Sequence, residues 1–171
     1  MWKMKINLPI SSRASLVILA GLSSFQGVAG EVSVARKFYE QPVVEQLRTL
    51  RQHPLPEQLD LYFFGNQVRH PPAIYLARCF ALNGAAAVAL LDSKLGVDSD
   101  DLAVRDITAL LATIDAMGTY DVAGNEKLMT ALRRRVENMK DDAWRDTAQK
   151  KLASVGNSRS ERAAKAPECG E

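Results

Sequence analysis

The chain has 171 residues, of which 47% are hydrophobic and 25% are charged, so it is long and apolar enough for one domain with a modest core. Its 22 basic and 20 acidic residues give a formal net charge of +2. Three of the basic residues and none of the acidic ones lie in residues 1–30, which leaves 19 basic against 20 acidic residues, a net charge of −1. This balance argues against a nucleic-acid-binding protein, which needs a concentrated basic surface.

Residues 1–30 have the layout of a secretory signal peptide. Lys3, Lys5 and Arg13 precede the apolar run ASLVILAGL (14–22). Val28 and Gly30 then occupy the −3 and −1 positions of a small-residue cleavage site. The apolar run is about half of the length that spans a bilayer, so we expect export rather than a permanent anchor. The sequence therefore predicts a periplasmic or secreted protein, cleaved near Gly30.

The first part of the remaining chain predicts two helices separated by prolines. Residues 31–53 carry apolar side chains at helical spacing: Val43, Val44, Leu47 and Leu50. Pro42 either opens the second part of this helix or breaks it. HPLP (53–56) ends it, and a second helix, with Pro56 in its first turn, runs to about His70.

Five more helices follow, and they cover residues 73–84, 85–96, 102–118, 126–140 and 141–156. The acids of DSDD (98–101), Asn125 and Asp141 are predicted to cap the last three. The last two helices carry apolar stripes, which are Leu128, Leu132, Val136 and Met139 in one and Trp144, Ala148 and Leu152 in the other. A short turn joins these two helices, so we expect their stripes to pack against each other and against a neighbour.

Residues 157–171 contain almost no large apolar side chain, so we expect a disordered tail after a helical domain of residues 31–156. One of the two cysteines, Cys169, lies in this tail, and the other, Cys79, lies in an apolar stretch. Export permits a disulfide between them. Their positions favour a buried thiol and a loose one, and the pairing stays open at this point.

Two similar triplets, VRD (104–106) and WRD (144–146), lie 40 residues apart, each after an acid-rich turn, and IYLARCFAL (74–82) is a weaker third copy. The string DDAWRDTAQKKLASVG resembles the second helix of the hairpins in the HEAT-repeat family, and the resemblance covers roughly residues 56–156. It implies an all-α fold with about three antiparallel helical hairpins in a short stack. The hairpins form either a HEAT-like α-solenoid or an irregular helical bundle, because each hairpin needs a neighbour to bury its apolar face.

The sequence contains no recognisable catalytic, cofactor-binding or metal-binding motif. His53 and His70 both precede a proline and have no nucleophile, acid or paired ligand at motif-like spacing. We therefore predict no catalytic residue, no cofactor and no metal. The alternative is an envelope enzyme acting on cell-wall material, with His70 and a carboxylate brought together by folding.

Two features are candidates for binding another protein. Arg133, Arg134 and Arg135 form a basic run on a predicted helix, and YFF (62–64) places three aromatics where they cannot all face one core. Tyr62 is therefore a candidate contact residue.

We predict a non-enzymatic protein-binding module of the bacterial envelope, either an adaptor or an immunity protein that inhibits a toxin. Its partner would be another envelope protein, with neither nucleic acid nor a stable membrane anchor involved. A periplasmic chaperone or structural subunit is the remaining alternative.

Overall fold

The computed structural model describes residues 34–96, 99–157 and 169, and these contain helices and no strand. The protein is all-α, as the sequence predicted. The chain divides into Met1–Val34, of which only Val34 is described, and the compact unit Ala35–Glu171. The predicted signal peptide and most of the predicted tail lie outside the described residues.

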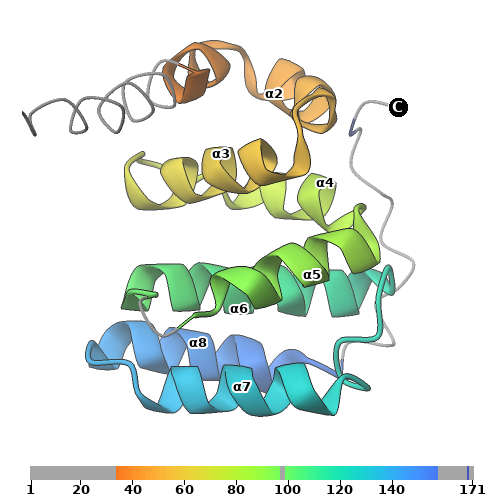
Figure 1. Cartoon of the computed structure of the whole chain (residues 1–171). Coiled ribbons are helices and arrows are strands. Elements are labelled where there is room, and N and C mark those ends of the chain that lie inside the picture. The colour runs from red at the N-terminus through yellow and green to blue at the C-terminus, as the bar shows by residue number, and fades with distance from the viewer. Residues whose placement is uncertain (1–33, 97–98, 158–168, 170–171) are drawn as a thin grey trace, which may run out of the picture. The chain divides into compact units, whose positions relative to one another are not determined.

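Residues 34–40 form a helix ahead of the labelled elements, which follow in the order α2 (Val43–Thr49), η1 (Leu50–Gln52), α3 (Leu55–Gln67), η2 (Ile74–Leu76), α4 (Ala77–Ala81), α5 (Gly84–Lys94), α6 (Asp101–Met117), α7 (Glu126–Glu137) and α8 (Asp142–Ser154) (Figure 1). The elements η1 and η2 are single 3₁₀ turns. Two predicted helices are divided in the structure. Residues 31–53 are interrupted at Pro42, which becomes the N-cap of α2, and residues 73–84 split into η2 and the short α4.

The predicted caps are confirmed. Asp100, Asn125 and Asp141 accept hydrogen bonds from backbone N–H groups in the first turns of α6, α7 and α8, at 2.7, 3.1 and 2.9 Å. Each bond satisfies one of the donors that a helix leaves unpaired at its start. Gly118 ends α6 in the left-handed region with φ 66°, where glycine has no steric penalty.

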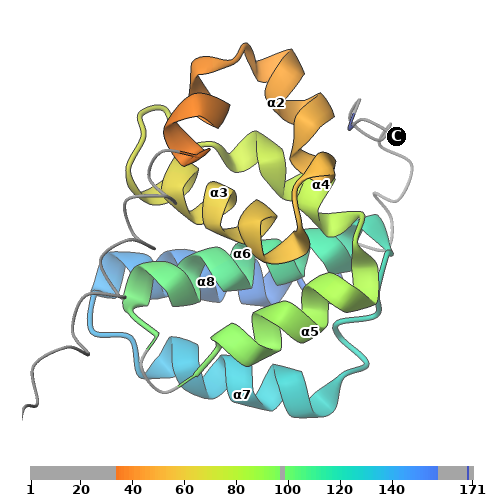
Figure 2. The same ribbon diagram turned by 45° about the horizontal axis from the view of Figure 1, so that its top comes forward.

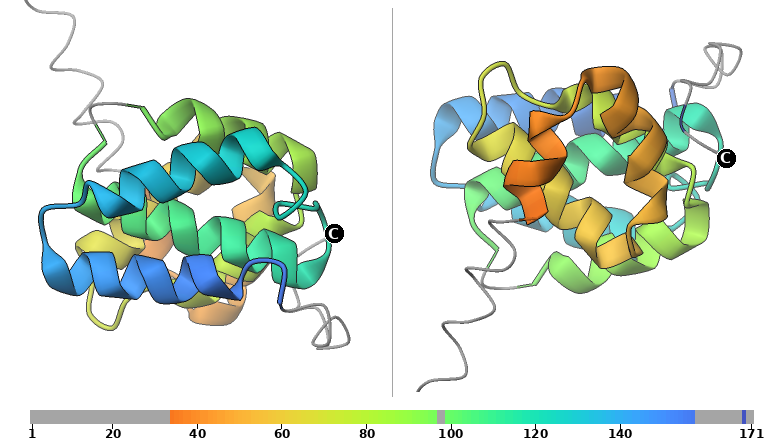
Figure 3. Two further views of the ribbon diagram at one scale, coloured as in Figure 1. Left: turned by 90° about the horizontal axis from the view of Figure 1, so that it is seen from below. Right: turned by 90° about the horizontal axis from the view of Figure 1, so that it is seen from above.

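The central element is α6, which packs against each of α3, α4, α5, α7 and α8. Its buried side chains form the middle of the core: Ile107, Leu110, Leu111 and Ile114. In Figure 2, α3 and α4 lie on one side of α6 and α7 lies on the other. Figure 3 shows α7 and α8 side by side against α6, so these two helices pack on each other and on this neighbour.

Burial confirms one predicted stripe and corrects two others. All four stripe residues of α7 are buried, which are Leu128, Leu132, Val136 and Met139. On α8, Ala148 is buried but Trp144 is 36% exposed. On α2, Val43 and Val44 are exposed and Gln46 is buried, whereas Leu50, the last member of the predicted stripe, is buried in η1.

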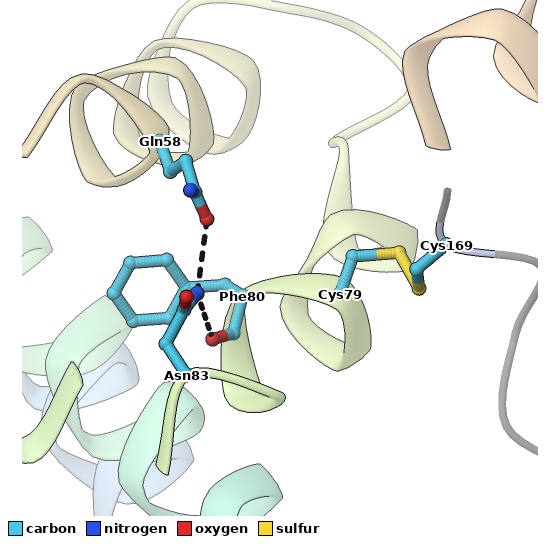
Figure 4. The surroundings of a disulfide bond; sticks show 5 residues. All are labelled: Gln58, Cys79, Phe80, Asn83 and Cys169. Atoms are coloured by element: carbon cyan, nitrogen blue, oxygen red, sulfur yellow. Dashed lines mark hydrogen bonds between the residues drawn. A yellow bond between two sulfur atoms is a disulfide. The ribbon is translucent and has the colours of Figure 1, made fainter. Parts of the chain in front are cut away.

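The two cysteines form a disulfide, so the expectation of a buried thiol and a loose one was wrong. Cys79 of α4 and Cys169 have their Cα atoms 5.4 Å apart, and both are buried (Figure 4). Beside the disulfide, the amide nitrogen of Asn83 donates to Gln58 at 3.0 Å and to the carbonyl of Phe80 at 2.8 Å. These bonds tie α3 to the corner between α4 and α5.

None of the described helices is by itself long and apolar enough to cross a membrane. The pair Ile74–Ala81 and Gly84–Lys94, bent by 120°, meets the length and composition test when its two parts are taken together.

Candidate functional site

The three arginines of α7 do not form one patch, because successive residues of a helix point about 100° apart. Arg133 and Arg134 are exposed, and Arg133 borders a groove of about 410 Å³ between α7 and α8. Arg135 is half-buried, and its Nη2 donates to the carbonyl of Ser99 at 3.0 Å. The arginines therefore face different surroundings.

Tyr62 is not the surface residue that the sequence predicted. Its side chain is only 1% exposed, whereas the next two aromatics, Phe63 and Phe64, are half-buried. Tyr62 lies near Asp106 and Arg105 of α6, against which α3 packs. Burial, together with the nearby carboxylate of Asp106, raises the pKa of the Tyr62 hydroxyl, so it stays neutral.

A surface site forms instead around Trp144, in the first turn of α8. The guanidinium carbon of Arg105 lies 4.3 Å from the centroid of the Trp144 ring, which is the geometry of a cation–π contact. Trp144 lines two pockets, and Arg105 belongs to one of them. The ring is thus fixed by a charged neighbour from α6 while more than a third of its surface is open.

The first of these, the apolar pocket, has a volume of about 210 Å³ and lies among α3, the α3–α4 connection, α6 and α8. Its apolar wall consists of Pro72, Ile74, Ala109 and Trp144. Tyr62 also lines it, so this predicted residue belongs to the site although it is buried. The volume is below the roughly 300–1,000 Å³ of typical small-molecule sites and suits a single side chain.

The second, the polar pocket, has a volume of about 640 Å³ and lies where the start of α6 meets the turn between α7 and α8. It contains Arg135, which the sequence singled out, and Lys140. Both of its carboxylates accept backbone hydrogen bonds. Asp100 caps α6, and Asp101 accepts from the N–H groups of Lys140 and Asp141 at 2.8 and 2.7 Å.

Asp106 holds Arg105 in place beneath Trp144. It is 2% exposed, and it accepts hydrogen bonds from Gln67 at 3.1 Å and from Arg105 at 2.8 Å, with a second guanidinium nitrogen at 2.7 Å. Burial raises the pKa of this carboxyl, and the bonds from Gln67 and Arg105 oppose the rise. The corresponding acid of the second triplet, Asp146, is exposed and pairs with Lys150, so the two triplets share a sequence but not an environment.

The two histidines lie in different surroundings in the part of the chain that the structure describes. His53 Nδ1 lies 3.0 Å from Glu57 Oε1 one turn later on the chain. His70 is exposed and makes no hydrogen bond or ion pair with a described carboxylate. Among the described residues, no group of three or more His, Cys, Asp or Glu side chains is placed to hold a metal ion.

Comparison with known proteins gives no relative: no family model, no curated protein and no solved structure matches the chain.

The sequence reasoning missed Trp144, Arg105 and Ile74 as members of one surface. Trp144 was assigned to the buried stripe of its helix, since its spacing from Ala148 and Leu152 is regular. The available signal was the repeated triplet, in which Trp144 is the large residue at the start of α8.

Proposed function

We propose that the protein is a non-enzymatic protein-binding module exported to the bacterial envelope, with Trp144 at the centre of its contact surface. The observation that carries the proposal is a partly exposed tryptophan held against an arginine beside an open pocket for one side chain. Tryptophan and arginine are the residue types enriched at the energetic centres of protein interfaces. Their attachment to packed helices gives a rigid surface, which lowers the entropic cost of binding.

The disulfide supports the envelope as the location. Disulfides persist in oxidising compartments and are rare in the cytosol, so the bond between Cys79 and Cys169 accords with the signal-peptide pattern. Cell fractionation tests this part: the protein should be released with the periplasmic or secreted fraction, with no free thiol that reacts with an alkylating reagent. Recovery in the cytosol with two reactive thiols would contradict export.

Chemical cross-linking in intact cells, followed by capture of the tagged full chain, tests binding. Wild-type protein should recover a specific envelope protein, and Trp144→Ala should lose it. The matched control is Val44→Ala, which removes an exposed apolar side chain on α2, 54% exposed, far along the chain from the site. Failure to recover any partner with the wild-type protein would count against the proposal.

Within this class, the narrower proposal is an immunity protein that inhibits a wall-attacking toxin. Its size, its all-α fold and its proposed location suit that role, and a rigid surface with a small pocket for one side chain suits an inhibitor. Cells that lack the protein should become sensitive to the toxin of a competing strain. Unchanged sensitivity would leave the adaptor role.

A further inference from the structure

Resting on this proposed function, we propose that the surface around Trp144 recognises an acidic protein segment that carries one large apolar side chain. The apolar side chain enters the apolar pocket, and carboxylates on either side of it pair with Lys140 and Lys151. The partner is thereby given a chemistry: an apolar anchor flanked by Asp or Glu.

The anchor follows from the walls of the apolar pocket. Ile74 is 69% exposed and lines the pocket together with buried Tyr62, so an aliphatic side chain that is largely open to solvent forms part of its wall. With Trp144 and Pro72, it offers apolar area that a single inserted side chain would cover. Burying a leucine- or phenylalanine-sized group in such a site is the main source of affinity at an interface centre.

The flanking acids follow from the charges that face the two pockets. All three carboxylates are already engaged: Asp100 and Asp101 with backbone N–H groups, and Asp106 with Gln67 and Arg105.

Unlike the three acids, which are already engaged, two lysines beside these pockets have no partner of opposite charge among the described residues. Lys140 lines the polar pocket and Lys151 the apolar one, both side chains are exposed, and neither forms an ion pair with the described residues. Each pocket that Trp144 lines thus has an exposed lysine without an ion-pair partner among the described residues, and complementary charge on an acidic partner would select it and speed its association.

Selection from a random-peptide library displayed on phage tests the inference directly. The target is the full chain with Trp2→Phe, so that Trp144 is the single tryptophan whether or not residues 1–30 are removed. We expect the selected peptides to share one large apolar residue with Asp or Glu nearby, and to shift the fluorescence of Trp144 on binding. The affinity should fall with added salt, because the flanking pairs lie at an exposed rim.

Two pairs of variants locate the contact. Ile74→Asp and Lys151→Glu should each weaken the selected peptides by about tenfold or more, the range of an interface hot spot. The matched controls are Val68→Asp and Lys150→Glu. Val68 is 64% exposed on the same connection as Ile74 but does not line the pocket, and Lys150 is the neighbour of Lys151 that pairs with Asp146. We expect less than about a twofold change for both controls.

Three results would overturn the inference. Selected peptides without acidic residues would show that the partner chemistry is wrong. Peptides that bind the Ile74→Asp and Val68→Asp variants equally would show that the binding site is wrong. A Trp144 shift with vesicles of anionic lipid and none with any peptide would assign the surface to a membrane instead. These results differ from a failure of the proposed function, which is tested by capture of a partner in cells. If a partner is captured and binds the Ile74→Asp variant as well as wild type, the protein-binding function stands and this site is wrong.

Discussion

Removing the disulfide between Cys79 and Cys169 tests how strongly the end of the chain is tied to the helical unit. The bond closes a loop with a sequence separation of 90 residues. In the chain-entropy description, releasing a loop of that length makes the unfolded state more favourable by about 4.6 kcal/mol. Since small domains unfold with free energies of about 5–15 kcal/mol, we expect Cys169→Ala to remove a large share of the stability. Cys169 is preferred over Cys79 for substitution because Cys79 is fully buried in the core.

Urea unfolding followed by circular dichroism measures the effect. With a slope of about 2 kcal/mol per molar urea, the unfolding midpoint of Cys169→Ala should fall by about 2 M. Wild-type protein treated with a reducing agent is the matched control and should unfold at the same midpoint as the variant. A reduced protein whose stability lies within about 1 kcal/mol of the oxidised one would refute the reasoning, because loop closure would then contribute little.

Three further predictions concern single side chains. Asp115 accepts hydrogen bonds from three backbone N–H groups, two in the connection after α6 and one just after α8. Asp115→Ala should therefore lower the free energy of unfolding, measured by urea titration, by about 3 kcal/mol. A loss below about 1 kcal/mol would contradict this role. The folded-state pKa of Asp106 is raised above its ordinary value of 3.8, so the folded protein holds this proton more tightly than the unfolded chain does. As the pH rises from below 3.8 through the raised folded-state pKa, the free energy of unfolding of wild type should therefore fall relative to that of Asp106→Asn. If the wild-type free energy of unfolding instead rises relative to the variant over this pH range, the pKa of Asp106 is lowered by folding and the prediction is wrong. Gly84 has φ 51°, and an added Cβ would lie 2.8 Å from the carbonyl oxygen of Thr119. Gly84→Ala should therefore lower the free energy of unfolding by about 2 kcal/mol, measured by thermal unfolding. Gly96 has open space around it, so Gly96→Ala is the control and should be tolerated.

Local features of the fold were predictable because they depend on neighbouring residues. The caps Asp100, Asn125 and Asp141 precede apolar helical patterns, and each one forms its bond. The stripe of α7 was predictable for the same reason, since its four members recur at helical spacing and all are buried. The all-α class follows from such repeated local signals.

Features that depend on distant segments were not predictable from one sequence. Pairing of Cys79 and Cys169 needs the tail to return to α4, and a separation of 90 residues carries no information about that return. In YFF, helical geometry says that the three aromatics diverge but not which one meets α6, and the structure buries Tyr62. The helical spacing of Trp144 predicted a core residue. In the structure, its ring is partly exposed and the guanidinium of Arg105 from α6 lies over one face of it.

The repeated triplets illustrate the limit of sequence similarity within the chain. The two residues that follow Val104 and Trp144 are the same, Arg and Asp. Yet Arg105 pairs with the buried Asp106, while Arg145 donates a hydrogen bond to the carbonyl of Met139 at 2.8 Å. The helix on which each triplet lies decides its contacts, because α6 is surrounded by other helices and α8 has one open side.

A photo-reactive amino acid placed at Ile74, and in a second protein at Val68, tests the central claim most directly. Both side chains are exposed on the connection between α3 and α4, but only Ile74 borders the pocket beside Trp144. After irradiation of intact cells, the protein carrying the probe at position 74 should form a covalent adduct with one envelope protein, through a peptide rich in Asp or Glu, and the probe at position 68 should not. Equal adducts at both positions, or none at position 74, would contradict the account.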